Sequence, residues 1–184
     1  RQHGPAGLQG QRFQPGQIVG GLRKSQRCAQ PADQGDYFWE LRACDYYDKF
    51  EKPKIMYQKF QVKPCFIYDA EGFFCNDSMW IIPTDDKVLL GILNSKLGWW
   101  LISKYCTAIQ NGYQLIWKYF SQIPIVTGDK EIRSALNQKV NDVLEQKKNN
   151  SQADTRRLEN EIDELVYQLY GLTPEEQRLV EGKS

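Results

Sequence analysis

The chain has 184 residues, 41% hydrophobic side chains and a mean hydropathy of −0.62, which suits one sizeable domain with appendages rather than two large enzymatic domains. Its net charge of +1 hides an asymmetry, because residues 1–128 carry 15 Lys and Arg against 11 Asp and Glu, whereas residues 129–184 carry 9 against 12. The mild basic excess of the first part permits an anionic partner, and lysines interrupt the most apolar window too often for a membrane span.

Sequence patterns that carry catalysis or bind metal are missing. The five cysteines include no CxxC pair and the single histidine is His3, so neither a zinc site nor histidine-based catalysis is expected. The chain also lacks a GxGxxG motif, a P-loop, a nucleophile elbow and the Asn/Asp-Pro-Pro-aromatic tetrapeptide of amino-methyltransferases. Asp85-Asp86-Lys87 has the D-x-K end of a nuclease motif, but Asp85 is more simply read as a helix cap. We therefore predict no catalytic residue and no metal ligand.

Cysteine usage also indicates the compartment. Because the odd number of cysteines forms no disulfide framework, we expect reduced thiols in the cytoplasm. Cys65 and Cys75 flank a predicted hairpin, which leaves a disulfide between them as the alternative.

The first half of the chain predicts an arm followed by strands. Residues 1–32 are rich in Gln and Gly and show no periodicity, which is typical of an arm or linker. After an aromatic and charged stretch, strands are predicted at 52–60, 65–69 and 73–83. Asp69-Ala70-Glu71-Gly72 is typical of a turn between the second and third strands. We expect these strands to form an antiparallel meander.

Residues 86–106 predict one helix that is apolar on almost every side. Such a helix is usually buried, and here it is expected to lie across the sheet as the central element of the core. Thr84 or Asp85 is expected to cap its start. Gly91 and Gly98 weaken a helix, and we expect them to let its backbone approach the sheet closely.

The remaining residues predict a polar turn and then helices. Asn111-Gly112 marks the turn. An amphipathic helix from Asp129 to Lys148 precedes a return helix that ends at Gly171, and a capping box from Thr173 to Glu176 opens a short last helix. The fold class is α+β, with a small antiparallel sheet packed on a buried helix and a C-terminal antiparallel helical hairpin. The predicted divisions are 1–32, 33–127 and 128–184.

Polar side chains suggest recognition of a nucleic acid. The segment Lys52–Lys63 mixes lysines, which can neutralise phosphates, with glutamines, which can pair with adenine edges. Taken alone, this segment is more plainly a solvated sheet face. Two further amide-rich stretches, 76–78 and 110–114, would project from the same sheet, and this convergence favours the binding interpretation.

Several stretches resemble a known family. FEKPKIMYQKF, KPCFIYDAEGFFCNDSMWII, LLGILNSKLGWWL and NGYQLIWKYFSQIPI are similar to the TaqI-like C-terminal specificity domain of Eco57I-like, type IIG restriction–modification enzymes. The tail NEIDELVYQLYGLTPEEQRLVEG resembles the end of those proteins, so the similarity covers Asp33 to Gly182.

The resemblance implies that residues 33–127 recognise a target in double-stranded DNA on behalf of an upstream adenine methyltransferase domain, with a nuclease in some members. S-adenosylmethionine would bind that upstream domain, and no cofactor is implied for this chain. Similar proteins often carry Arg where this chain has Gln114, which leaves a changed target base as one consequence.

Our hypothesis for the DNA contacts combines lysines that hold phosphates with amides and a tyrosine that read base edges. The predicted residues are Lys54, Gln58, Lys59, Lys63, Asn76, Gln110, Asn111, Tyr113, Gln114 and Lys118. The alternative is a protein–protein interaction module in which the helical hairpin of 129–171 docks on a partner and the sheet is a scaffold.

Overall fold

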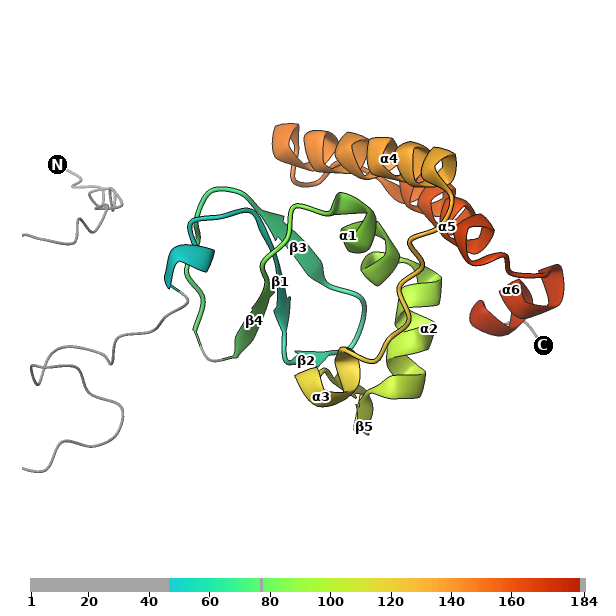
Figure 1. The fold of residues 1–184 in the computed structure, drawn as a ribbon, viewed down its shortest axis with the longest axis horizontal. Helices are drawn as coiled ribbons and strands as arrows, with labels where there is room; N and C mark the ends of the chain where they lie inside the picture. Colours follow the sequence, from blue (N-terminus) through green and yellow to red (C-terminus); the bar gives the residue numbers. More distant parts are fainter. Residues whose placement is uncertain (1–46, 77, 183–184) are drawn as a thin grey trace, which may run out of the picture. The chain divides into compact units, whose positions relative to one another are not determined.

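The computed structural model describes residues 47–76 and 78–182, which belong to a compact unit running from Cys44 to Ser184 (Figure 1). The predicted arm at 1–32 and most of the aromatic stretch that follows it, up to residue 46, lie outside the described residues. A 3₁₀ turn at Tyr47–Lys49 precedes the first strand. Within the described ranges, no helix is both long and apolar enough to cross a lipid bilayer.

The first sheet has its central strand first in sequence. Strand β1 (Lys54–Gln58) pairs antiparallel with β3 (Phe66–Asp69) on one side and with β4 (Met79–Ile82) on the other. The predicted meander is therefore wrong, because β3 and β4 are not neighbours and the segment between them crosses to the far side of β1. The central strand is also the most buried of the three, since four of the five residues of β1 are buried.

A second sheet, which was not predicted, is formed by β2 (Phe60–Gln61), β6 (Gly112–Gln114) and β5 (Thr107–Ile109) in that order. The β5–β6 turn is made by Gln110 and Asn111, one residue earlier than expected. Gly112 is required by close packing, because a Cβ there would lie 2.0 Å from the carbonyl oxygen of Gln61.

The predicted single helix is two helices, α1 (Lys87–Asn94) and α2 (Lys96–Tyr105). Ser95 ends the first and caps the second, since its Oγ donates to the Ile92 carbonyl at 2.7 Å and accepts from the Gly98 N–H at 3.0 Å. The start of α1 is capped by Asp86 instead of Thr84 or Asp85, and its carboxylate accepts from the backbone N–H of Val88 and Leu89.

Gly91 and Gly98 were expected to let the helix backbone approach the sheet. In the structure, both glycines instead lie close to helical residues. A Cβ on Gly91 would lie 2.8 Å from Val140 Cγ2, on the facing helix α4. A Cβ on Gly98 would lie 2.1 Å from the Ile92 carbonyl oxygen, at the break between α1 and α2. Helix α1 packs on β3 and on α4, so it lies between the sheet and the helical hairpin.

The C-terminal helices follow the prediction closely. Helix α4 (Lys130–Asn149) and helix α5 (Arg156–Tyr170) form the antiparallel hairpin, and α5 ends at Gly171 with a positive φ of 65°. A full capping box opens α6 (Pro174–Val180), and a short α3 (Trp117–Phe120) precedes the hairpin. The α+β class, with a small antiparallel sheet on a buried helix and a helical hairpin after it, is confirmed.

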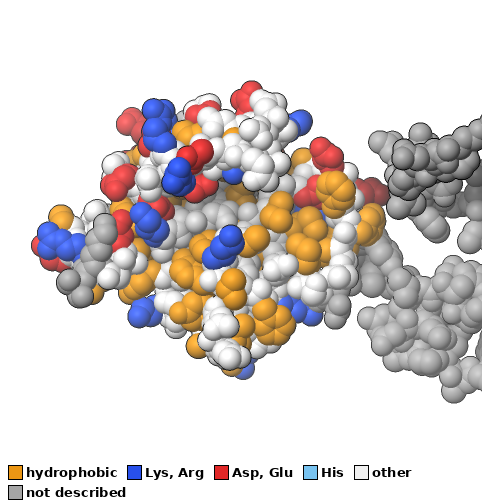
Figure 2. Space-filling view, turned by 180° about the vertical axis from the view of Figure 1, so that it is seen from behind, with side chains coloured by type: hydrophobic (Ala, Val, Ile, Leu, Met, Phe, Trp, Pro, Cys, Tyr) orange, Lys and Arg blue, Asp and Glu red, His pale blue; other side chains and the backbone are white. Residues whose placement is uncertain are grey.

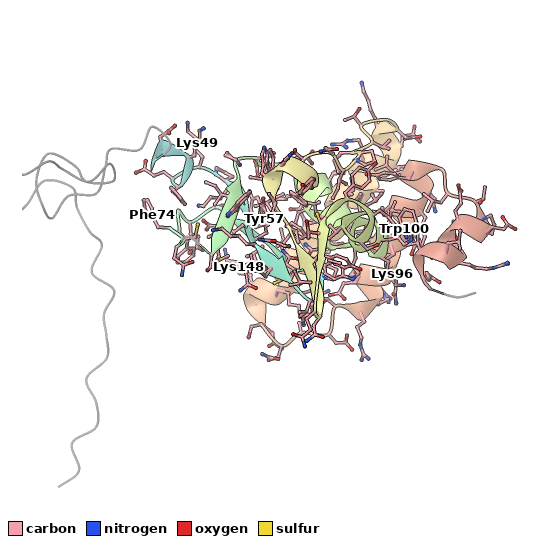
Figure 3. The ribbon with its side chains drawn as sticks, turned by 90° about the horizontal axis from the view of Figure 1, so that it is seen from below. Lys49, Tyr57, Phe74, Lys96, Trp100 and Lys148 are labelled. Atoms are coloured by element: carbon pink, nitrogen blue, oxygen red, sulfur yellow. The ribbon has the colours of Figure 1, made fainter. Side chains whose placement is uncertain are left out.

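One hydrophobic core joins these layers. Tyr57 of β1, labelled in Figure 3, is 1% exposed and belongs to one hydrophobic cluster with residues of α1, α2 and both helices of the hairpin. The apolar stripes of α4 and α5 are therefore buried inside the unit. The most completely buried aliphatic side chains are Ile55, Ile92, Ile102, Leu115, Leu136 and Val166.

Candidate nucleic-acid interface

Most of the predicted DNA-binding residues lie where the two sheets meet. Gln58 ends β1 and pairs with Met79 of β4, three residues after Asn76. Lys63 lies in the loop between β2 and β3, and Gln110 and Asn111 form the tip of the β5–β6 hairpin. In Figure 1, β2, β5 and α3 lie together along the lower edge of the described unit.

Lys59 is the residue that joins the two sheets. Its backbone N–H donates to the Ser78 carbonyl at 3.0 Å, next to β4, and its carbonyl accepts from the Leu115 N–H at 2.8 Å, next to β6. Its half-buried side chain reaches over the Trp80 ring, with Nζ 5.8 Å from the ring centroid. The ammonium group is thereby held at the junction.

The second sheet presents one polar and aromatic row outward. Strand pairing places Phe60, Gln114 and Thr107 in one row, and because side chains alternate, Gln61 and Tyr113 point to the opposite face. Phe60 is 53% exposed and Gln61 is buried, which identifies the Phe60 row as the outward one. Gln114 is therefore placed beside an exposed aromatic ring.

Tyr113 is turned inward, toward α2. Its ring meets that of Trp99 edge to face, with the centroids 5.2 Å apart. Its side chain is half-buried, so its first role is to hold the β5–β6 hairpin against α2.

Gln61 supports the loop that carries Lys63. Its Nε2 donates to the Cys65 carbonyl at 3.3 Å, and its Oε1 accepts from the Cys65 N–H at 3.1 Å. This side chain is 2% exposed, so the amide is used to shape the backbone and not to contact a ligand. Lys63 itself is exposed on that loop.

Lys54 is the one predicted residue that the structure places away from the others and from solvent. It is completely buried at the opposite end of β1. Its ammonium forms an ion pair with Asp69 and donates to the Phe50 carbonyl at 2.6 Å. We therefore leave Lys54 out of the proposed DNA contacts.

The two sequence ranges that supply most of the junction contain no acidic residue, and Asp77, between Asn76 and Ser78, lies outside the described residues. No Asp or Glu occurs from Lys52 to Tyr68 or from Lys87 to Gly128, while each of these two ranges contains four lysines. The carboxylates of the C-terminal part lie on the hairpin helices and α6 or directly next to them. On the face shown in Figure 2, hydrophobic side chains gather over the lower part, Lys and Arg side chains are spread over the upper and lower parts, and the acidic side chains lie in the upper part or at the sides. Such a surface attracts polyanions.

Exposed aromatic rings among these lysines were missed from the sequence. Phe60 is 53% exposed and Trp117, next to Lys118, is 51% exposed. Period 2 in Gln58-Lys59-Phe60-Gln61-Val62 indicates the exposure of Phe60, because Gln58, Phe60 and Val62 fall on one side. No comparable periodicity marks Trp117, since the short helix α3 carries it.

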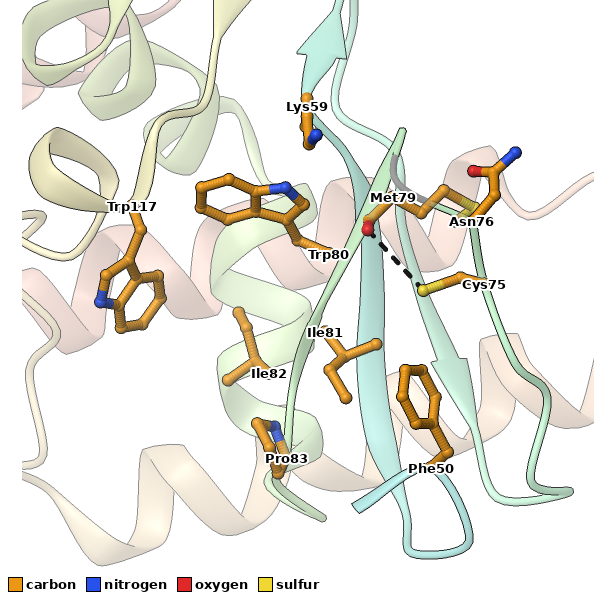
Figure 4. A pocket seen from close by; sticks show the side chains of 10 residues that line it. All are labelled: Phe50, Lys59, Cys75, Asn76, Met79, Trp80, Ile81, Ile82, Pro83 and Trp117. Atoms are coloured by element: carbon orange, nitrogen blue, oxygen red, sulfur yellow. Dashed lines mark hydrogen bonds between the residues drawn. The ribbon is translucent and has the colours of Figure 1, made fainter. Parts of the chain in front are cut away.

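A groove opens beside β4, the edge strand of the first sheet. It has a volume of about 600 Å³, and Figure 4 shows Trp80 and Trp117 on one side of β4, with Cys75 and Phe50 on the other. Among the described residues that line it, Lys59 is the one that carries a charge. The lining is Phe50, Lys59, Cys75, Asn76, Met79, Trp80, Ile81, Ile82, Pro83 and Trp117.

Several side chains with catalytic or metal-binding potential can be placed within the described residues. Cys65, Cys75 and Cys106 are free thiols, and burial raises the pKa of Cys106 to about 11, so this thiol stays protonated at neutral pH. Within the described ranges, no three His, Cys, Asp or Glu side chains are grouped as a metal site requires. In the nuclease-like D-x-K tripeptide, Asp85 accepts a hydrogen bond from the Tyr68 hydroxyl, and the middle residue, Asp86, caps α1 and pairs with Arg133 at 3.1 Å.

Comparison with known proteins gives two findings. No curated protein matches the chain. Among solved structures, the fold is similar to "Type IIL restriction-modification enzyme MmeI in complex with DNA", with a TM-score of 0.59 and 10% sequence identity. The match covers 71% of this chain and 20% of that one, so this chain spans about a fifth of its length. At this identity, the similarity concerns the fold alone.

The sequence also matches a family directly. Residues 23–125, more than half of the chain, match the family described as the TaqI-like C-terminal specificity domain. This range contains both sheets, the helices α1 to α3 and all the predicted contact residues. The chain therefore belongs to the TaqI-like C-terminal specificity domain family.

Proposed function

We propose that this chain recognises a target sequence in double-stranded DNA and directs an attached restriction–modification methyltransferase to it. The observation that carries the proposal is the junction of the two sheets, where lysines, exposed amides and aromatic rings share a surface without a carboxylate from either flanking range. Membership of the specificity-domain family and a fold like that of a DNA-bound restriction–modification enzyme support it.

In this proposal, the lysines position the domain and the amides select the sequence. Lys59, Lys63 and Lys118 contact phosphates. The β5–β6 hairpin has the form of a two-stranded ribbon, which the major groove of B-DNA can admit, with Gln110 and Asn111 at its tip. Gln58, Asn76 and Gln114 read base edges beside it, and Tyr113 supports the hairpin from behind.

The finer parts of the proposal concern the parent protein. It would be a type IIG, Eco57I-like enzyme that methylates adenine at N6, with S-adenosylmethionine held by the methyltransferase domain and with a nuclease in some arrangements. The division of the chain into a recognition part at 33–127 and a hairpin at 128–184 belongs to the same proposal.

A titration of the 184-residue chain against duplex DNA, followed by fluorescence anisotropy over a series of salt concentrations, tests the function. We expect affinity to fall steeply with salt, because each phosphate neutralised contributes about −0.9 to the slope of log K against log [salt]. Replacing Lys63 and Lys118 by Ala should flatten the slope by about 2. The matched control replaces Lys130 and Lys148 of α4, which are equally exposed, and should leave it unchanged.

The outcome against the proposal is equally definite. Two results would contradict the proposal. One is that the chain binds no duplex at low salt, and the other is that both pairs of substitutions change the salt slope equally. The alternative, a protein-interaction module using the hairpin, has no specific support, because the apolar stripes of α4 and α5 pack on each other and on α1.

A further inference from the structure

Two tryptophans at the edge of the groove are held in place by an aromatic cluster beneath them. Tyr57, Phe66 and Phe120 form the buried part of this cluster, with ring centroids 5.1 to 5.8 Å apart. The ring of Trp80 lies 6.2 Å from that of Tyr57, and the ring of Trp117 lies 6.3 Å from that of Phe120. Both indoles are therefore anchored to the core although they reach the surface.

This arrangement keeps an apolar surface open next to a cation. Figure 4 shows the two indoles on the same side of β4, with Lys59 above Trp80. Trp117 is 51% exposed, and Lys118 follows it directly in the chain. Lys59 Nζ lies 5.8 Å from the centroid of the Trp80 ring and lines the groove together with Trp80 and Trp117. An open indole surface and an ammonium group in one groove point to a flat, aromatic and anionic ligand.

A nucleotide has this combination of properties. Its base offers a π-face that stacks on an indole, and its phosphate is an anion that a nearby ammonium can contact. Because the aromatic cluster fixes both indoles beforehand, stacking requires little additional ordering of side chains. A base that is paired and stacked within a duplex has no free face, so the ligand must be a base outside the stack.

We propose that the Trp80–Trp117 end of the groove receives one unstacked base of the bound DNA, with Lys59 contacting its phosphate. This rests on the proposed function and adds to it a site for a nucleotide displaced from the duplex. Stacking is tolerant of base identity, so the site would hold any of the four bases and would not contribute to the choice of target.

The test compares three DNA probes of one sequence: an intact duplex, the duplex with a single-nucleotide bulge, and one strand alone. Anisotropy titrations with the 184-residue chain should show tighter binding of the bulged duplex than of the intact duplex. Trp117→Ala should remove this preference, lowering the affinity for the bulged duplex by about 5- to 100-fold more than the affinity for the intact duplex. Trp117→Phe should retain most of it, since a ring remains.

Trp100→Ala is the matched control, because Trp100 on α2 also has a lysine over its ring, with Lys104 Nζ at 5.0 Å. Trp100 lies across the described unit from Phe74 (Figure 3) and does not line the groove. This variant should keep the preference for the bulged duplex. Equal binding of the bulged and intact duplexes by the unmodified chain, or a preference that survives Trp117→Ala, overturns the inference and leaves the proposed function intact.

The remaining outcomes separate the two proposals further. The chain could bind the bulged duplex and the single strand but not the intact duplex, and lose this binding in Trp117→Ala. That result supports the base site in the groove and overturns duplex recognition. Absence of binding to all three probes overturns both.

Discussion

The carboxylate of Asp163, in α5, caps the start of α2 from a position 67 residues away in the chain. Its Oδ1 accepts from the Lys96 N–H at 2.8 Å, and its Oδ2 pairs with the Lys96 ammonium at 3.2 Å. Lys96 also reaches Glu181, beyond α6, at 3.3 Å. A polar contact thus fastens the helical hairpin to the helix pair that supports the sheets.

Removing the Asp163 carboxylate should destabilise the fold. Asp163 is 6% exposed, and Asp163→Ala leaves the Lys96 N–H without its acceptor, which costs about 1–3 kcal/mol of unfolding free energy. Asp163→Asn keeps an oxygen at the same place and should cost less, because burial raises the pKa of the native carboxyl even though Lys96 opposes this. Urea unfolding of both variants checks the order, with Glu145→Gln at an exposed position of α4 as the control. A larger loss for Asn than for Ala contradicts it.

Lys54 and Asp69 form the most deeply buried ion pair, and Lys54→Met should be strongly destabilising. The substitution leaves the Asp69 carboxylate buried without its cation, for which a loss of about 3–5 kcal/mol is expected. Lys52→Met is the control, since Lys52 pairs with Asp48 in solvent at 3.0 Å and should contribute less than about 1 kcal/mol. Similar losses for the two variants in denaturant unfolding would contradict this account.

The same pair predicts how stability varies in acid. Burial by itself raises the pKa of Asp69, but the hydrogen bonds from Lys54 and from the Glu71 and Phe73 N–H groups outweigh it and lower the pKa below its usual value. A lowered pKa means that the stabilisation is complete above the unfolded pKa of about 3.9 and disappears as the pH falls through the folded value. Unfolding free energies measured across this range should fall with acid in the native chain and be much flatter in Lys54→Met.

Gly91→Ala tests the close approach of α1 to α4. Alanine improves helix propensity by about 1 kcal/mol, but its Cβ would lie 2.8 Å from Val140 Cγ2, and overpacking typically costs about 1–3 kcal/mol. We therefore expect a net loss in unfolding free energy. Val140→Ala removes the clashing methyl groups, so the double variant should be more stable than the sum of the two single changes predicts. Gly128→Ala, with a nearest contact of 3.6 Å, is the neutral control.

Gln114 and Lys63 should have separable effects on DNA binding. Gln114→Ala removes a side chain on the outward row of the second sheet, and we expect it to reduce discrimination among sequences by about 1–3 kcal/mol at constant salt slope. Lys63→Ala should weaken binding to all sequences alike and flatten the salt slope by about 0.9. Selection of bound sequences from a random pool, combined with salt titrations, distinguishes the two. A changed slope in Gln114→Ala would assign this residue to phosphate contact instead.

The sequence was most informative where structure depends on neighbouring residues. The capping box of Thr173 and Glu176 and the left-handed Gly171 need only residues within a few positions, and both occur as predicted. The break at Ser95 was missed, because the start of the second helix is completed by Asp163, far away in the sequence. Hydrophobic periodicity and helix propensity alone predict one helix over residues 86–106.

The candidate site shows the same division. The amides and lysines around the sheet junction stand out locally as polar residues in turns, and their contact with DNA stays a prediction. Lys54 looks identical to them in the sequence, and only its pairing with Asp69, brought opposite by β1–β3 register, shows that it is internal. Strand order was missed for a related reason. No local pattern within β1 shows which strands form hydrogen bonds with its two edges.

The backbone of Lys59 is hydrogen-bonded to residues next to both sheets, Ser78 and Leu115. This link restricts which sequence changes can alter the binding surface without moving the backbone. Any main-chain displacement of the β5–β6 hairpin is transmitted through Leu115 and Lys59 to Ser78, and so to the strand that carries Trp80. An insertion in the hairpin would therefore disturb the groove, whereas exchanges of single side chains at Thr107, Ile109 and Gln114 leave this shared frame unaltered. New binding preferences are most economically obtained by such point exchanges on a constant backbone.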